Sequence, residues 1–170
     1  ELTNGMADAI SPVWDESGKY LYFLASTDFA LNTGWLDMTS YDRPVTRGLY
    51  VAILQDGEPS PFRPVNDEEE VEETQQEADE KDTEKESEED VKKSASDVVV
   101  TIDFDDIDRR IVDAQSLTQR NYTGLIPGLE GKVFVLESIL NQTGETLHQY
   151  SLKERKATSL LEGVEAITIS

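Results

Sequence analysis

The stretch from Ser11 to Ser26 reads SPVWDESGKYLYFLAS and predicts two short strands joined by a tight turn. The first strand ends at Trp14, and the second covers Tyr20 to Leu24, which is rich in aromatic residues that favour β-structure. Gly18 lies in the polar turn, where glycine takes positive φ without steric cost. Two strands alone are marginal in water, so this hairpin requires neighbouring strands. The large side chains that we expect these neighbours to bury are Trp14, Tyr22 and Phe23.

Further strands follow the same plan. Gly48 to Leu54 predicts a third strand, and a second group of four strands begins near Tyr122. Gly131-Lys132, an apolar run and Ser138 repeat the pattern that begins at Gly18-Lys19. Repeated antiparallel four-stranded units are typical of β-propeller blades, so the sequence predicts an all-β fold with about two blades. The strands predicted for the second blade are Tyr122–Leu129, Lys132–Ser138, Thr146–Leu152 and Lys156–Leu161.

Two long segments interrupt this pattern. Thr27 to Arg47 is far longer than an ordinary hairpin connection, and its apolar residues predict an ordered loop that packs against another surface. Asp67 to Lys93 contains 15 acidic residues, four lysines and no aromatic residue. Such a stretch buries too little apolar area to offset its ordering entropy, so we expect it to be disordered. Its acidic charge is also compatible with a docking tail for a basic partner.

These features divide the chain into five parts. The insertion interrupts the fold, because Val98 to Phe104 predicts a strand whose partner is Arg110 to Val112. The predicted parts are a blade with a long inter-strand loop (1–66), the disordered acidic insertion (67–97), blade-connecting strands (98–120), a second blade (121–164) and the start of a further blade (165–170).

The length of 170 residues is too small for a closed propeller, which requires at least four blades of about 40 residues each. The chain also opens without a methionine, and Ile167 to Ser170 has the composition of a strand that continues. We therefore expect the chain to be a segment of a larger protein.

Composition excludes several classes of function. The net charge of −21 repels the phosphates of nucleic acids and anionic lipid surfaces, so we expect neither as a partner. The chain has no cysteine, and no apolar run is long enough to cross a bilayer. No phosphate-binding glycine loop or nucleophile elbow occurs, so no cofactor is predicted.

Three groups of residues are candidates for a functional site. His148, the single histidine, lies in a predicted strand without a second metal ligand or a nucleophile beside it, so we expect it at the solvent or on an edge strand rather than as a general base. The acidic residues after Ile102 lack the glycine and the distal glutamate of a calcium loop, which favours a solvated turn over a cation site. Arg109 and Arg110 could hold a peptide carboxylate, but pairing with these neighbouring aspartates is favoured. The acidic residues are Asp103, Asp105, Asp106 and Asp108. No catalytic, cofactor-binding or metal-binding residue is therefore assigned.

Several longer motifs resemble a known family. The pattern from Pro12 to Ser26 is similar to propellers of the TolB and prolyl oligopeptidase types and indicates the architecture alone. More specific is the stretch from Leu24 through Trp35 to Tyr50, which resembles bacterial homologues of tricorn protease. Pro59 to Phe62, the variable acidic insertion and Ile102 to Arg110 extend this resemblance over most of the ordered part of the chain.

The resemblance implies a place in the second, larger propeller of a tricorn-like serine peptidase, a family that degrades oligopeptides, often as a large homo-oligomer. It implies a non-catalytic role in substrate access or positioning and in assembly, together with the remaining blades and the protease domains. The catalytic serine, histidine and glutamate of the family belong to later domains, so none is carried over to this chain. The alternative is a TolB-like propeller that acts as a protein–protein interaction module. We expect a cytoplasmic location, with the periplasm as the alternative.

Overall fold

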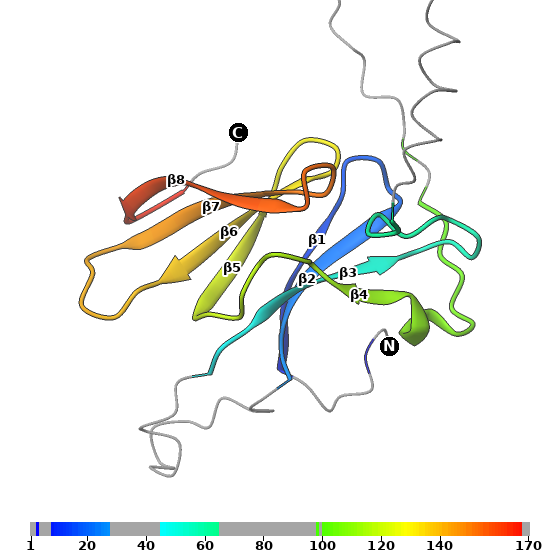
Figure 1. Ribbon diagram of the computed structural model, residues 1–170, viewed down its shortest axis with the longest axis horizontal. Helices are drawn as coiled ribbons and strands as arrows, with labels where there is room; N and C mark the ends of the chain where they lie inside the picture. The colour runs from blue at the N-terminus through cyan, green and yellow to red at the C-terminus, as the bar shows by residue number, and fades with distance from the viewer. Residues whose placement is uncertain (1–2, 4–7, 28–44, 65–97, 99, 168–170) are drawn as a thin grey trace, which may run out of the picture. The chain divides into compact units, whose positions relative to one another are not determined.

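The computed structural model describes residue 3 and residues 8–27, 45–64, 98 and 100–167. These residues form two four-stranded antiparallel sheets, each with its strands in sequence order (Figure 1). The predicted all-β fold is confirmed, and each sheet is one propeller blade. Most of the predicted long loop and all of the predicted acidic insertion (67–97) lie outside the described residues.

The first sheet is built from the predicted hairpin and two later strands. Its strands are β1 (Asp8–Trp14), β2 (Tyr20–Ser26), β3 (Gly48–Ile53) and β4 (Ile111–Asp113). Gly18 has φ of 71°, as its turn requires, and a Cβ there would lie 2.6 Å from Cγ1 of Val98. Val98, which follows the insertion, therefore packs directly against the turn at Gly18.

The second sheet has the four predicted strands with small changes at their ends. They are β5 (Tyr122–Pro127), β6 (Lys132–Ser138), β7 (Glu145–Ser151) and β8 (Lys156–Val164). Alternation decides which side chains are buried in β6, where Val133, Val135 and Glu137 are buried and the intervening residues are half-buried.

The prediction of a strand from Val98 to Phe104 is wrong. The described residues of this segment form no strand, and β4 pairs with β3 instead. Because β4 occupies the edge of β3, the segment has no strand to join; the amide of Asp103 bonds to the carbonyl of Leu54 at 2.9 Å. A short 3-10 helix, η2 (Ile107–Arg110), leads into β4. The stretch assigned to blade-connecting strands thus supplies the fourth strand of the first blade.

The expected burial of the large side chains of the first hairpin is confirmed for two of three. Tyr22 and Phe23 are buried, whereas 49% of Trp14 is exposed. Trp14 pairs with Leu21 at the end of edge strand β1, so its side chain lies on the outward face of the sheet.

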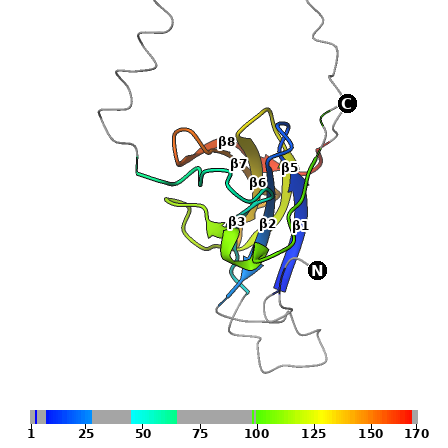
Figure 2. The same cartoon turned by 90° about the vertical axis from the view of Figure 1, so that its right-hand side faces the viewer.

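The two sheets pack against each other through one apolar core, which we call the joint. Strand β5 contacts both β1 and β2, and the two views agree that β1 and β5 lie side by side (Figures 1 and 2). The first sheet contributes Tyr22, Leu24, Leu49 and Val51, and the second contributes Tyr122, Val133, Val135 and Tyr150.

Hydrogen bonds define which positions of the two sheets are equivalent. The amide of Leu54 bonds to the carbonyl of Lys19, and the amide of Leu152 bonds to the carbonyl of Gly131. Lys19 is therefore equivalent to Gly131, one residue away from the match that the Gly-Lys repeat predicts. A one-residue shift moves every side chain to the other face of a strand. The sequence repeat thus located the correct strand, and the hydrogen bonds set its alignment with the first sheet one residue away from the Gly-Lys match.

Candidate functional site

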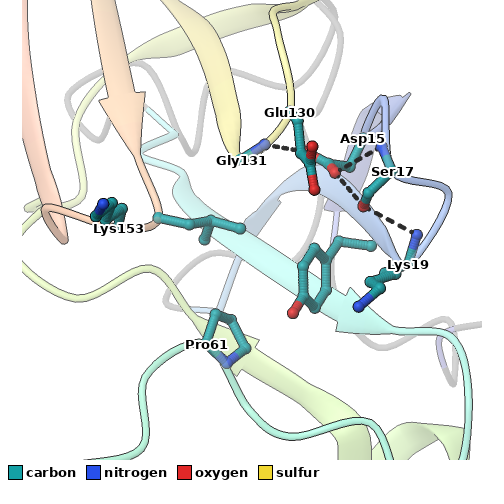
Figure 3. A pocket seen from close by; sticks show the side chains of 9 residues that line it. Asp15, Ser17, Lys19, Pro61, Glu130, Gly131 and Lys153 are labelled. Carbon is teal, nitrogen blue, oxygen red and sulfur yellow. Dashed lines mark hydrogen bonds between the residues drawn. The ribbon is translucent and has the colours of Figure 1, made fainter. Parts of the chain in front are cut away.

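One pocket lies beside the joint, at the end where the strands turn. It has a volume of about 310 Å³ and lies among the β1–β2 turn, the β5–β6 turn and the residues that follow β7 (Figure 3). We call it the turn pocket. Its lining residues are Asp15, Ser17, Lys19, Tyr20, Pro61, Glu130, Gly131, Leu152 and Lys153.

Asp15 joins the two sheets at this pocket. Its Oδ1 accepts a hydrogen bond from the amide of Gly131 at 2.8 Å (Figure 3). The same oxygen accepts a hydrogen bond from the hydroxyl of Tyr22, also at 2.8 Å. Its Oδ2 accepts from the amide of Ser17 at 3.0 Å and from the hydroxyl of the same serine. Burial, followed by the charge of Asp15, raises the pKa of Tyr22. A buried carboxylate with these donors is a structural link between two turns.

Lys19 of the turn pocket is also paired. The ammonium of Lys19 lies 2.8 Å from Glu58, and the amide of Lys19 donates to the hydroxyl of Ser17 at 3.3 Å. Burial, and then the charge of Glu58, raises the pKa of Tyr20. The hydroxyl of Ser17 donates to the carboxylate of Asp15, and no imidazole that could act as its general base is among the residues that line this pocket.

His148 lies in a second pocket, at the opposite end of the joint. The histidine pocket has a volume of about 240 Å³. Its lining residues are Ser116, Leu117, Thr118, Arg120, Tyr122, His148 and Ala157. The prediction that His148 faces solvent or lies on an edge strand is wrong: β7 is an inner strand, and only 14% of the side chain is exposed.

A buried carboxylate holds this histidine. Nε2 of His148 lies 2.7 Å from Oε2 of Glu137, whose side chain is 7% exposed, and Nη1 of Arg120 lies 3.2 Å from Oε1 of the same glutamate. Tyr122 packs edge-on against His148 with ring centroids 6.5 Å apart. Burial raises the pKa of Tyr122 to about 12; the charge of Glu137 adds to the rise and Arg120 opposes it.

Backbone hydrogen bonds to Arg47 hold Arg120 in place. Arg120 exchanges two backbone hydrogen bonds with Arg47, at 2.7 and 3.2 Å. The guanidinium of Arg47 in turn contacts Asp8 at 2.5 Å and donates to the carbonyl of Tyr122 at 3.3 Å. Sequence reasoning missed three members of this group, Glu137, Arg120 and Arg47. Only the pairing of β6 with β7 and the contact between the sheets bring these residues together. The sequence signal that was available is the alternation of β6, which places Glu137 on the same face as Val133 and Val135.

Of the tandem arginines, Arg109 pairs with a neighbouring aspartate, as the sequence favoured, whereas Arg110 bonds to backbone carbonyls next to the first sheet. Arg110 donates to the carbonyls of Ile53 at 3.2 Å and Asp105 at 3.0 Å, and to that of Asp103. Arg109 lies 3.7 Å from Asp106. A carboxylate oxygen of Asp103 accepts from the amide of Asp56 at 2.8 Å. The described residues contain no group of three potential ligands placed to hold a metal ion.

The described residues also contain no helix that is long and apolar enough to cross a membrane. The predicted compartment stays a prediction.

Comparisons with known proteins give the fold. No protein-family model matches the chain, and no curated protein matches it. Among solved structures, the crystal structure of the tricorn protease is similar, with a TM-score of 0.54 and 17% sequence identity. The similarity covers 96% of this chain and 14% of that one, so the chain spans a small part of the length of the protein it matches. The chain has a tricorn-like propeller fold.

Proposed function

We propose that this chain is a non-catalytic portion of the propeller of a tricorn-like serine peptidase that degrades oligopeptides. The observation that carries the proposal is the succession of two blades, joined face to face, that matches the tricorn protease over 96% of the chain. In this proposal the propeller guides or positions peptides and contributes to assembly, while hydrolysis takes place elsewhere in the protein.

The chemistry of the two pockets supports a non-catalytic role. A serine nucleophile requires an imidazole within hydrogen-bond reach and an orienting carboxylate behind it. In the described part of the chain, the imidazole–carboxylate pair of His148 and Glu137 lies at one end of the joint, and Ser17 bonds to Asp15 at the other. The carboxylates of both pockets stabilise contacts between elements, which suits a positioning scaffold.

The partners follow from the same proposal. They are peptide substrates, further propeller blades, the protease domains of the parent protein and other copies of that protein in a homo-oligomer. The strongly acidic composition favours peptides that carry positive charge, because the field of the chain attracts cations.

A serine-reactive fluorophosphonate probe tests this function on the product of the complete gene. We expect the product to cleave fluorogenic oligopeptides and to carry the label on a serine outside residues 1–170, as located by peptide mapping. A label within these residues would contradict the non-catalytic role. A gene product that neither reacts nor cleaves peptides would contradict the peptidase proposal and favour an interaction module.

A further inference from the structure

Three apolar surfaces line the turn pocket. They are the ring of Tyr20 at the start of β2, the ring of Pro61 in the segment that follows β3, and the side chain of Leu152 directly after β7. The volume of about 310 Å³ is near the lower limit of about 300 Å³ for ligand pockets in proteins. The pocket therefore suits one long side chain and is too small for a bulky ligand.

Three polar side chains of the pocket make no hydrogen bond or ion pair with a described residue. They are the hydroxyl of Tyr20, the carboxylate of Glu130 and the ammonium of Lys153. The backbone amide of Glu130 donates to Glu16 at 2.8 Å, which holds the main chain of this residue and leaves its carboxylate free. Lys153 lies apart from Glu130 and from Asp15 (Figure 3). A ligand can therefore bond to Glu130 without displacing an existing contact of its carboxylate.

The electrostatic field at the ring of Tyr20 is negative. Asp15 is 4% exposed, and the partners of its carboxylate are amides and hydroxyls rather than cations. Glu130 adds a second carboxylate, whereas the charge of Lys19 is balanced by Glu58 at 2.8 Å. Burial raises the pKa of Tyr20, and these three carboxylates add to the rise while Lys19 opposes it. Such a field attracts a cation to the ring and repels an anion.

A cation on a long apolar stem matches both the walls and the charge. Its stem packs on Leu152 and Pro61, as the methylene groups of basic side chains do on apolar surfaces. Its head lies over the ring of Tyr20 and donates to the carboxylate of Glu130. Arginine fits better than lysine, because the planar guanidinium stacks on an aromatic ring and donates two parallel hydrogen bonds to a carboxylate.

We infer that the turn pocket binds one basic side chain, arginine in preference to lysine, of a peptide that lies across the turns of the two sheets. This inference rests on the proposed function, because it takes the peptide to be a substrate of the parent peptidase. The net charge of −21 attracts basic peptides to the chain as a whole, and the turn pocket gives this attraction a defined position.

Isothermal titration of the complete gene product tests this inference, after a fluorophosphonate has blocked any reactive serine. The ligands are an end-blocked tripeptide with a central arginine between two alanines and the same peptide with citrulline, which keeps the shape of arginine without its charge. We expect the citrulline peptide to bind about tenfold more weakly. Glu130→Gln should weaken binding of the arginine peptide about fivefold. Glu162→Gln, which removes an exposed charge from β8, should change it less than about twofold.

A second variant acts in the opposite direction. Lys153→Gln removes a cation from the pocket and should tighten binding of the arginine peptide about twofold, which keeps the test decisive if Glu130→Gln alters the turn. Equal binding of the two peptides, equal effects of Glu130→Gln and Glu162→Gln, or no measurable binding would overturn the inference.

The outcome is separate from the test of peptidase activity. Binding that requires arginine and Glu130, in a product without a reactive serine, would contradict the proposed activity alone. An active peptidase whose affinity for the arginine peptide does not change in Glu130→Gln and Lys153→Gln would contradict the proposed role of the turn pocket alone.

Discussion

Equivalent residues of the two sheets have different environments in this chain. Leu24 of the first sheet is completely buried, whereas its equivalent Leu136 in the second sheet is half-buried. The same strand position holds an apolar side chain in both cases. The difference shows that the neighbouring sheet, and not the strand itself, determines how far a side chain is buried.

A second pair of equivalent positions differs in chemistry. Tyr50 and Ala25 of the first sheet correspond to His148 and Glu137 of the second. In the second sheet these positions hold a hydrogen-bonded pair that faces the joint, and in the first sheet they are uncharged. The same face of the two sheets therefore has the same strand geometry but a different polarity. Only the second sheet presents a charged, hydrogen-bonded pair on this face.

We expect the largest effect on the free energy of unfolding from a substitution in β3. Val51→Gln places an amide in the joint, where Val51 is 0% exposed, and is expected to lower the free energy of unfolding by about 4 kcal/mol through lost apolar burial and an unpaired polar group. The matched variant Gln149→Val, at the equivalent position of the second sheet, where the side chain is half-buried, is expected to change it by less than about 0.5 kcal/mol. Urea unfolding of the 170-residue chain, followed by circular dichroism, measures both. Equal effects would refute the difference between the faces.

Truncation of the equivalent leucines gives the next largest difference. Leu24→Ala leaves a cavity in the joint and is expected to cost about 3 kcal/mol, whereas Leu136→Ala is expected to cost about 1 kcal/mol. The same urea measurement applies, with Leu140→Ala in the exposed turn as the control. A larger loss at Leu136 than at Leu24 would mean that the face of the second sheet that carries Leu136 is also covered in this chain.

Removing the charge of Glu137 tests the polar position of the joint. We expect Glu137→Gln to cost about 1 kcal/mol, because an amide keeps a hydrogen bond to His148 and Arg120 is exposed enough to regain water. His148 is the single histidine, so its imidazole resonances in NMR spectra are unambiguous and should shift in this variant. Unchanged resonances would show that the pair does not form. Glu162→Gln on β8 is the surface control.

Alkaline pH tests the tyrosines of the joint. Burial raises the pKa of Tyr122 and of Tyr150 from an ordinary value near 10 to about 12, with added effects of Glu137 and Asp113 respectively. Since the neutral phenol is favoured in the folded state, its contribution is complete below pH 10 and is lost as the pH rises to about 12. The free energy of unfolding should therefore fall across this range. Tyr150→Phe should make the fall shallower, and an equally steep fall in that variant would exclude Tyr150 as a cause.

The smallest effect is expected at the position equivalent to Gly131. Lys19 pairs with Glu58 at 2.8 Å, and this hydrogen bond and charge raise the pKa of the lysine. The pair is exposed to solvent and the second sheet has no side chain at this position, so Lys19→Ala should leave the urea midpoint within experimental error. A clear destabilisation would show that the turn pocket depends on this pair.

Much of the fold could be predicted from the sequence. The hairpin around Gly18 and the four strands of the second sheet were located because alternation and turn residues are local signals. The strand predicted at Val98 was wrong because its β-branched residues fit a strand, while the edge of β3 was already occupied by β4. The candidate site was harder to predict than the fold. No catalytic residue was assigned because the sequence contains no catalytic motif. The environment of His148 was misjudged because the pairing of β6 with β7 brings Glu137 next to it.

The sequence by itself determined where the strands and turns lie, because side-chain alternation and glycine conformations act over a few residues. Only the tertiary structure decided which face of each strand is buried, how Asp15 reaches Gly131, and that Arg120 and His148 share one carboxylate. The physical reason is that a face becomes a core only when another sheet covers it. The identity of that sheet depends on contacts between residues more than 100 positions apart, such as the 116 positions that separate Asp15 from Gly131.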